Sequence, residues 1–233
     1  MHSFTQKCLL QGHKDNVWVV MFSPDERFLI SGGMDATMII RDVLTGRLIK
    51  RITVEPKQVN IEGVFPEIEY FLPNSLIPGA FYKDGNVLFT GSTDGLIRIF
   101  DMNRFEFTDT LYGHHGAVYN FAISSDGSKL ATGSWENELF IWDLHTYEVL
   151  HHLRSKIHIA YSLKFMNNDT YLLGAGGKFI SIWDIESETI IRKFEGQTGL
   201  QQCGFSPDGK YLAVGTPESD ILIRDMSELI LNR

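Results

Sequence analysis

The sequence has few cysteines and no long run of apolar or basic residues. Its 233 residues include only two cysteines, Cys8 and Cys203, whereas a small domain held by disulfides carries more of them at closer spacing. We expect both thiols to be reduced and packed as small apolar side chains. No stretch reaches the roughly 18 apolar residues of a membrane span, and residues 1–10 lack the apolar core of a signal peptide. We therefore expect a soluble intracellular protein, cytoplasmic or nuclear, without membrane insertion.

The charge balance is acidic, with a formal net charge of −8 and no cluster of Lys or Arg along the chain. Such a chain repels phosphate backbones on average, so we expect no nucleic-acid partner. Hydrophobic residues make up 43% of the sequence, which is enough for a sizeable core. The length suits one all-β domain, and we expect residues 1–233 to form a single domain.

A repeat is the main organising feature. Five similar segments end in an aspartate, at Asp42, Asp101, Asp143, Asp184 and Asp225, and these aspartates are 59, 42, 41 and 41 residues apart. A period of roughly 40–45 residues is that of propeller blades, each a four-stranded antiparallel sheet. The repeat therefore predicts an all-β propeller with five recognisable blades.

Within each repeat, short apolar runs alternate with turn residues. In the first repeat we expect strands at Val17–Phe22, Phe28–Ser31, Thr37–Ile40 and Arg47–Ile52, with turns at Ser23–Glu26 and Gly32–Gly33. The same Ser-x-Asp turn pattern returns at 124–127 and 206–209, and a closing outer strand returns at Thr189–Phe194. No segment has helical periodicity, so the fold class is all-β.

Two repeats share a start and an end that identify a family. Gly12-His13 leads to Arg41-Asp42, and Gly113-His114 leads to Trp142-Asp143, with 28 residues from each His to the Arg or Trp. Together with the five similar repeat ends, this pattern resembles the WD-repeat family over nearly the whole chain.

The resemblance implies a structural hydrogen-bond network in each blade, made by a His, a Ser or Thr, an Asp and a Trp. Carried onto this sequence, the network residues are His13, Ser31, Asp35, Thr90, Asp94, His114, Thr132, Trp142 and Trp183. No repeat has the full set, because Arg41 and Phe100 replace Trp and Glu136 replaces Asp. A His, a Ser or Thr and an Asp also occur in hydrolases, but their recurrence within a repeat favours the structural role.

Five blades are fewer than the seven usual in this family, which leaves the closure of the ring open. In one arrangement the amino-terminal segment Gln6–Gln11 pairs beside Asp220–Asp225 and closes the ring. In the other, the ring is incomplete and its open edge is completed by a partner, by self-association or by a longer chain.

An insertion at about Pro56–Asn74 explains the one long spacing. It is rich in Phe, Tyr, Ile and Pro. Two interpretations stay open, a loop folded on the edge of the propeller and an element that docks a partner.

The resemblance also implies where partners bind, because WD propellers most often use the loop face around the central channel. The matching candidate positions are Trp18, Met34, Ile77, Thr93, Tyr119, Phe121, Trp135, Tyr161 and Gln201. Of these, Trp135 is the sharpest candidate, since a Trp in a tight turn has little core to join.

The first functional hypothesis is therefore a non-enzymatic scaffold, a subunit that recruits proteins or peptides into a larger assembly. The alternative is a propeller-fold glycosidase or sugar-binding lectin, which would need carboxylates converging on the channel. We expect no cofactor and no metal site. His145, His151, His152 and His158 are close in sequence, but adjacent strand residues such as His151 and His152 point to opposite faces.

Overall fold

The structure, a computed structural model, describes residues 8–54, 75–154, 162–200, 202–206, 210–215 and 220–226, with the backbone alone at 177–178, 196–200 and 202–203. Every described element is a β-strand, which confirms the predicted all-β class. The chain divides into two compact units, Met1–Thr110 and Leu111–Arg233, and each is described by itself. Within the described residues, no helix is long and apolar enough to cross a bilayer.

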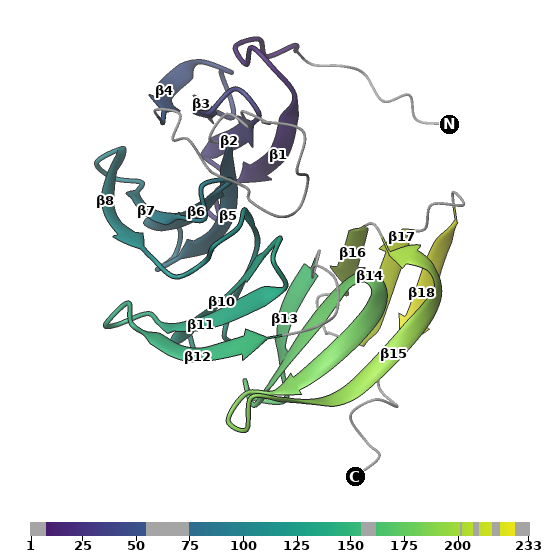
Figure 1. The fold of residues 1–233 in the computed structure, drawn as a ribbon. Helices are drawn as coiled ribbons and strands as arrows, with labels where there is room; N and C mark the ends of the chain where they lie inside the picture. The colour runs from purple at the N-terminus through teal and green to yellow at the C-terminus, as the bar shows by residue number, and fades with distance from the viewer. Residues whose placement is uncertain are drawn as a thin grey trace, which may run out of the picture. The chain divides into compact units, whose positions relative to one another are not determined.

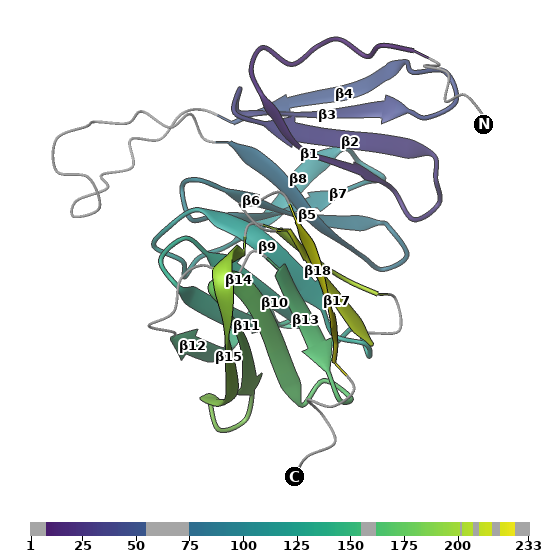
Figure 2. The same cartoon turned by 90° about the vertical axis from the view of Figure 1, so that its right-hand side faces the viewer.

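The first unit contains two four-stranded antiparallel sheets in sequential strand order (Figure 1). The first sheet is formed by β1 (Val17–Phe22), β2 (Phe28–Gly33), β3 (Thr37–Asp42) and β4 (Leu48–Thr53). Its strands β2, β3 and β4 are seen side by side in Figure 2. The second sheet is formed by β5 (Leu76–Tyr82), β6 (Val87–Ser92), β7 (Ile97–Asp101) and β8 (Glu106–Leu111).

The second unit contains three sheets. The third sheet is formed by β9 (Val118–Ile123), β10 (Lys129–Ser134), β11 (Glu138–Asp143) and β12 (Val149–Arg154). The fourth is formed by β13 (Ser162–Met166), β14 (Tyr171–Asp184) and β15 (Thr189–Leu200). The fifth is formed by β16 (Gln202–Phe205), β17 (Tyr211–Gly215) and β18 (Ile221–Asp225).

The fourth sheet follows the same plan as the four-stranded sheets, although β14 is a single 14-residue element. A fully extended strand of that length would separate its ends by about 46 Å. Instead, the N–H of Ile185 donates to the carbonyl of Thr170 at 3.1 Å, so the two ends of β14 lie side by side. The same backbone bond closes the other hairpins, at 2.7–2.9 Å, from Val43 to Arg27, Met102 to Asn86, Leu144 to Ser128 and Met226 to Lys210. The element β14 therefore doubles back, and the shortened segment at 175–177 is the tip of its hairpin.

The Ser-x-Asp turns recur as predicted. In each of three turns the Ser hydroxyl accepts a hydrogen bond from the N–H five residues later, at 2.8–2.9 Å, in the pairs Ser23 and Phe28, Ser124 and Lys129, and Ser206 and Tyr211. The side chain replaces a backbone partner in the turn and sets the register of the strand that follows. Each of these sheets thus begins its second strand at an equivalent position.

The predicted turn at Gly32–Gly33 is wrong, because both glycines lie in β2 and the turn is formed by residues 34–36. Close approach of the backbone, rather than turn geometry, requires glycine here. A Cβ on Gly32 would lie 2.2 Å from the Leu76 carbonyl oxygen and 2.5 Å from Cδ of Pro78 in β5. The residue that adopts positive φ in the turn is Ala36, at 57°.

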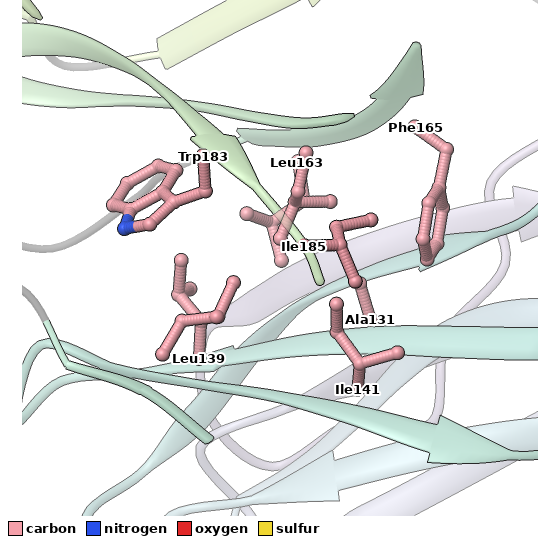
Figure 3. Close-up of a cluster of buried hydrophobic side chains, with 9 residues drawn as sticks. Ala131, Leu139, Ile141, Leu163, Phe165, Trp183 and Ile185 are labelled. Atoms are coloured by element: carbon pink, nitrogen blue, oxygen red, sulfur yellow. The ribbon is translucent and has the colours of Figure 1, made fainter. Parts of the chain in front are cut away.

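Apolar faces of consecutive sheets pack together within each unit. In the first unit, Ile30, Met38 and Ile40 of the first sheet pack against Leu76 and Leu88 of the second. In the second unit, the third and fourth sheets share a cluster that includes Ala131, Leu139, Ile141, Leu163, Phe165, Trp183 and Ile185 (Figure 3). The fourth and fifth sheets share another, formed by Leu173, Ala175, Ile180, Ile182, Leu212, Val214 and Met226. The middle strands of the fourth sheet therefore serve two cores, one on each face.

Other expectations about the ends and the insertion have mixed outcomes. Cys8 is a free, exposed thiol, so the prediction that it packs in a core is wrong; it lies outside any strand, where no sheet face covers it. Residues 8–11 are not in a strand, and residues 1–7 and the insertion 56–74 lie outside the described residues. Among the described strands, β18 pairs with β17 alone, so closure by the amino-terminal segment stays a prediction.

Replacing Gly32 with Ala should destabilise the first unit, because the added methyl group would push against the β5 backbone. Overpacking of this kind costs about 1–3 kcal/mol of the free energy of unfolding, measurable by urea denaturation. Gly204→Ala in β16 is the matched control, since nothing lies within 4 Å of its Cβ position. Equal stability of the two variants would contradict the close approach of β2 and β5.

Candidate functional site

The hydrogen-bond network of the first sheet is centred on His13. Its Nδ1 lies 3.0 Å from an Asp35 oxygen, and its Nε2 lies 2.8 Å from the Ser31 hydroxyl. Burial opposes ionisation of Asp35, but hydrogen bonds from Thr37, Lys14 and His13 outweigh it and lower the pKa of this carboxyl to about 2. The network joins the loop before β1 to the hairpin of β2 and β3.

Arg41, at the position where the family has Trp, and Arg51 of β4 both lie beside Gly12. Arg41 donates hydrogen bonds to the carbonyls of Gly46, at 2.9 Å, and of Gln11. Arg51 donates to the carbonyl of Gly12 at 2.8 Å. Guanidinium groups present several donors in a fixed plane, so these side chains hold the Gly-His loop by its backbone, where an indole would hold it by packing.

The third sheet has the His, Thr and Trp of the network without its Asp. The Thr132 hydroxyl lies 2.7 Å from His114 Nε2 and accepts a hydrogen bond from Trp142 Nε1 at 2.8 Å. The buried Nδ1 of His114 has no hydrogen-bond partner among the described residues. Burial lowers the pKa of His114 to about 3, so this imidazole is neutral at physiological pH.

The second and fourth sheets depart further from the network. Thr90 donates to the carbonyl of Arg98 at 3.3 Å, and Asp94 pairs with Arg98 at 2.6 Å. Arg98 is thus the partner of the turn residue Asp94, whereas in the first sheet the turn Asp pairs with a His. The sequence pattern did not reveal this pairing. Trp183 is buried in the core between the third and fourth sheets (Figure 3).

An aromatic pair stands at the loop end of the third sheet. Tyr119 lies at a register shift where β9 meets β10, and Trp135 begins the turn between β10 and β11. Their ring centroids are 6.3 Å apart in an edge-to-face arrangement. The Trp135 side chain is 45% exposed, and its backbone N–H is fixed to the Ala117 carbonyl at 2.9 Å. Tyr119 and Trp135 therefore form an aromatic pair with an exposed Trp, and both residue types are enriched in binding hot spots.

The remaining candidate positions differ in their exposure to solvent. Trp18 is exposed, whereas Met34 and Phe121 are half-buried. Ile77 and Thr93 are buried in the first unit and offer little surface to a partner. Tyr161 and Gln201 lie outside the described residues. The structure therefore brings together two of the predicted residues, Tyr119 and Trp135.

Sequence reasoning missed a second group at the same sheet. His115 Nδ1 and His152 Nε2 lie 3.1 and 3.2 Å from the two oxygens of Glu138. The signal was present in part, since His115 follows the Gly-His start directly. The register that places His152 next to Glu138, with Phe140 opposite His152, is visible only in the structure.

Consecutive antiparallel sheets packed face to face, with a His and Ser or Thr network across the strands, define blades of a β-propeller protein. The WD40 family, described as "WD domain, G-beta repeat", matches residues 4–42, 74–101 and 105–143 of this chain. Three repeats of this chain therefore match the WD40-repeat family.

Curated relatives match parts of the chain. Ribosomal RNA-processing protein 9 of Saccharomyces cerevisiae is 26% identical over 108 residues, which is 46% of this chain and 16% of that protein. WD repeat-containing protein 91 of Danio rerio is 47% identical over 45 residues, covering 19% of this chain and 6% of the relative. The matched regions thus span a small fraction of these longer proteins.

Solved structures match nearly the whole chain. The structure of U3-55K has a TM-score of 0.77 at 19% identity and covers 94% of this chain and 63% of that one. The crystal structure of RRP9 WD40 repeats has a TM-score of 0.76 at 19% identity, with 94% and 62% covered. At this identity the likeness shows the fold.

The neutral His114 should make the protein less stable as the pH falls. Its pKa is about 3 in the folded chain and near 6.5 when unfolded, so the unfolded state gains a proton first. The stabilisation is complete above pH 6.5 and is lost progressively as pH falls toward 3, by about 2 kcal/mol at pH 5. Urea unfolding at pH 7.5 and 5.0 measures this loss.

The variant His114→Gln should lose less stability than the natural chain between these two pH values. His145→Gln changes an exposed histidine in the turn after β11 and serves as the control, which should keep the full loss. If the His114→Gln variant lost as much stability as the natural chain, His114 would not be the group responsible.

Proposed function

We propose that this chain is a non-enzymatic interaction module that recruits proteins or peptides through the aromatic pair Tyr119 and Trp135. The observation that carries the proposal is a half-exposed Trp held in a tight turn against a second aromatic ring. Large rings lose little conformational entropy on binding, and such residues dominate interface energetics. The WD40 blade supplies the rigid support that a loop site needs.

One curated relative is named for ribosomal RNA processing. We propose that this chain takes part in an assembly with such a role, through protein contacts in the cytoplasm or nucleus. The net charge of −8 favours a protein partner, because an acidic surface repels RNA phosphates on average. Basic or neutral peptides with an apolar anchor suit the aromatic pair best.

Trp135→Ala should remove partners that dock on the aromatic pair. Loss of a hot-spot Trp costs about 2 kcal/mol or more, roughly a 30-fold weaker Kd. Affinity purification of the tagged chain from cells, with quantitative mass spectrometry, should show a set of proteins depleted with Trp135→Ala.

The control is Tyr112→Ala, which removes an exposed aromatic side chain outside the pair. It should retain the full set of partners. If Trp135→Ala and Tyr119→Ala each retain every partner found with the natural chain, the aromatic pair is not the binding site.

A second candidate function rests on the outer face of the fifth sheet. The residues two and four positions before each closing aspartate are buried in the first four sheets, as Met38, Ile40, Ile97, Ile99, Leu139, Ile141, Ile180 and Ile182. The equivalent residues of the fifth sheet, Ile221 and Ile223, are 75% and 71% exposed. Where the next sheet lies in the same unit, it covers these positions.

The face of the first sheet that does not pack against the second sheet is also uncovered. Val20 and Phe22 lie on one face of β1 and are exposed, whereas the equivalent Phe121 and Ile123 of β9 are half-buried. We propose that each of these two faces binds a β-sheet of another chain. Apolar strand surfaces of this kind can pack stably against another sheet. When they stay exposed to solvent, they promote association and aggregation.

The free chain should therefore self-associate at high concentration. Light scattering should give a mass above the 26.5 kDa of one chain, and Ile221→Ser with Ile223→Ser should shift the protein toward that value. Leu44→Ser, on an exposed turn residue, is the matched control and should leave association unchanged. A natural chain that stays monomeric up to high concentration contradicts sheet-mediated association.

A further inference from the structure

A cluster of metal-ligating side chains lies at one end of the third sheet. His115 comes from the loop before β9, Glu136 from the turn between β10 and β11, and Glu138 from the first position of β11. One ligand atom from each of the three lies within 4.8 Å of the others. We propose that His115, Glu136 and Glu138 form a binding site for a divalent transition-metal ion of the zinc type.

The spacing of the two best-placed atoms fits such an ion. His115 Nδ1 and Glu138 Oε2 are 3.1 Å apart. Zinc binds nitrogen and carboxylate oxygen at about 2.0–2.2 Å in tetrahedral geometry, which separates neighbouring ligand atoms by roughly 3.3–3.5 Å. A shift of a few tenths of an ångström therefore exchanges the hydrogen bond for two metal bonds, and the exposed Glu136 can complete the set from its turn.

A third histidine, His152, lies beside the central carboxylate of the cluster. His152 Nε2 lies 3.2 Å from Glu138 Oε1, yet this buried nitrogen has no hydrogen bond of acceptable geometry among the described residues. The ring of His152 is stacked on Phe140 at 4.1 Å, which fixes its plane. The neighbouring His114, itself almost fully buried, also has an unpartnered nitrogen. The unpartnered His114 nitrogen is a buried polar atom of the kind that a water molecule or an ion satisfies, and it belongs to the residue directly before His115.

The electrostatics favour a dication. Glu138 lies between His115 and His152, with its two oxygens 3.1 and 3.2 Å from their nearest ring nitrogens. The side chain is only 12% exposed, so its negative charge is weakly screened. With Glu136 the site carries two carboxylates, which attract a dication.

The donor set selects the class of metal. An imidazole nitrogen with two carboxylates suits zinc and other first-row transition metals, whereas calcium and magnesium prefer oxygen ligands alone. His115 is 70% exposed, so an ion can enter from solvent and retain an open coordination position. This inference concerns metal binding alone and does not depend on the proposed protein-recruiting function.

Isothermal titration with ZnCl₂ tests the site, using the whole chain with Cys8→Ser to remove the exposed thiol as a competing ligand. We expect one strong site per chain, and at least a tenfold weaker Kd for each of His115→Ala and Glu138→Gln. MgCl₂ should show no binding that competes with zinc. Because His115 is exposed, its replacement should leave the circular dichroism spectrum unchanged.

The matched control is His145→Ala, an exposed histidine 3.7 Å from the Asp143 carboxylate in the same unit. It should bind zinc as tightly as the parent chain. His152→Phe keeps a ring against Phe140 and removes the contact with Glu138, so we expect about a tenfold weaker Kd, as for other groups that orient a metal ligand. Equal affinity of the parent chain and His115→Ala, or a parent chain that takes up no zinc at all, would overturn the proposal.

Discussion

The packing of one sheet face against the next is the interaction on which the rest of this structure depends. Each closing strand alternates, so the residues two and four positions before the aspartate share one face. In the first, third and fourth sheets that face meets the following sheet, and each such contact forms an apolar cluster. Burial of apolar area at about 25 cal/mol per Å² is the main source of stability in such an arrangement. Gly32 belongs to the same constraint, because its missing side chain allows the β5 backbone to approach.

The hydrogen-bond networks are secondary to this packing and vary from sheet to sheet. His13 is fully engaged with Ser31 and Asp35, whereas His114 is engaged through one nitrogen only. A buried donor or acceptor without a partner costs about 1–3 kcal/mol. That cost is tolerable where the aromatic rings of Phe140 and Trp142 pack around the imidazole. The sheets therefore share an architecture without sharing one set of polar contacts.

A single replacement connects the structural network to both proposed sites. In the third sheet the turn position that holds Asp35 in the first sheet holds Glu136. The longer side chain leaves His114 Nδ1 without a carboxylate and places its own carboxylate near His115 and Glu138. Trp135, one residue earlier, forms the exposed half of the aromatic pair. The turn between β10 and β11 therefore lacks the carboxylate of the structural network. Instead it supplies Trp135 to the aromatic pair and Glu136 to the proposed metal site.

The sequence alone determined the repeat, the all-β class, the Ser-x-Asp turns and the WD-repeat resemblance, because local spacing and turn chemistry carry these features. It misplaced the turn at Gly32–Gly33, since glycine serves close packing as well as turns and the sequence does not say which. It also treated Ile77 and Thr93 as surface candidates, although both are buried. Only the tertiary structure decided that Tyr119 contacts Trp135, that His115 and His152 flank Glu138, and that Ile221 and Ile223 are uncovered. Those outcomes depend on register and on contacts between strands distant in sequence, which no local pattern encodes.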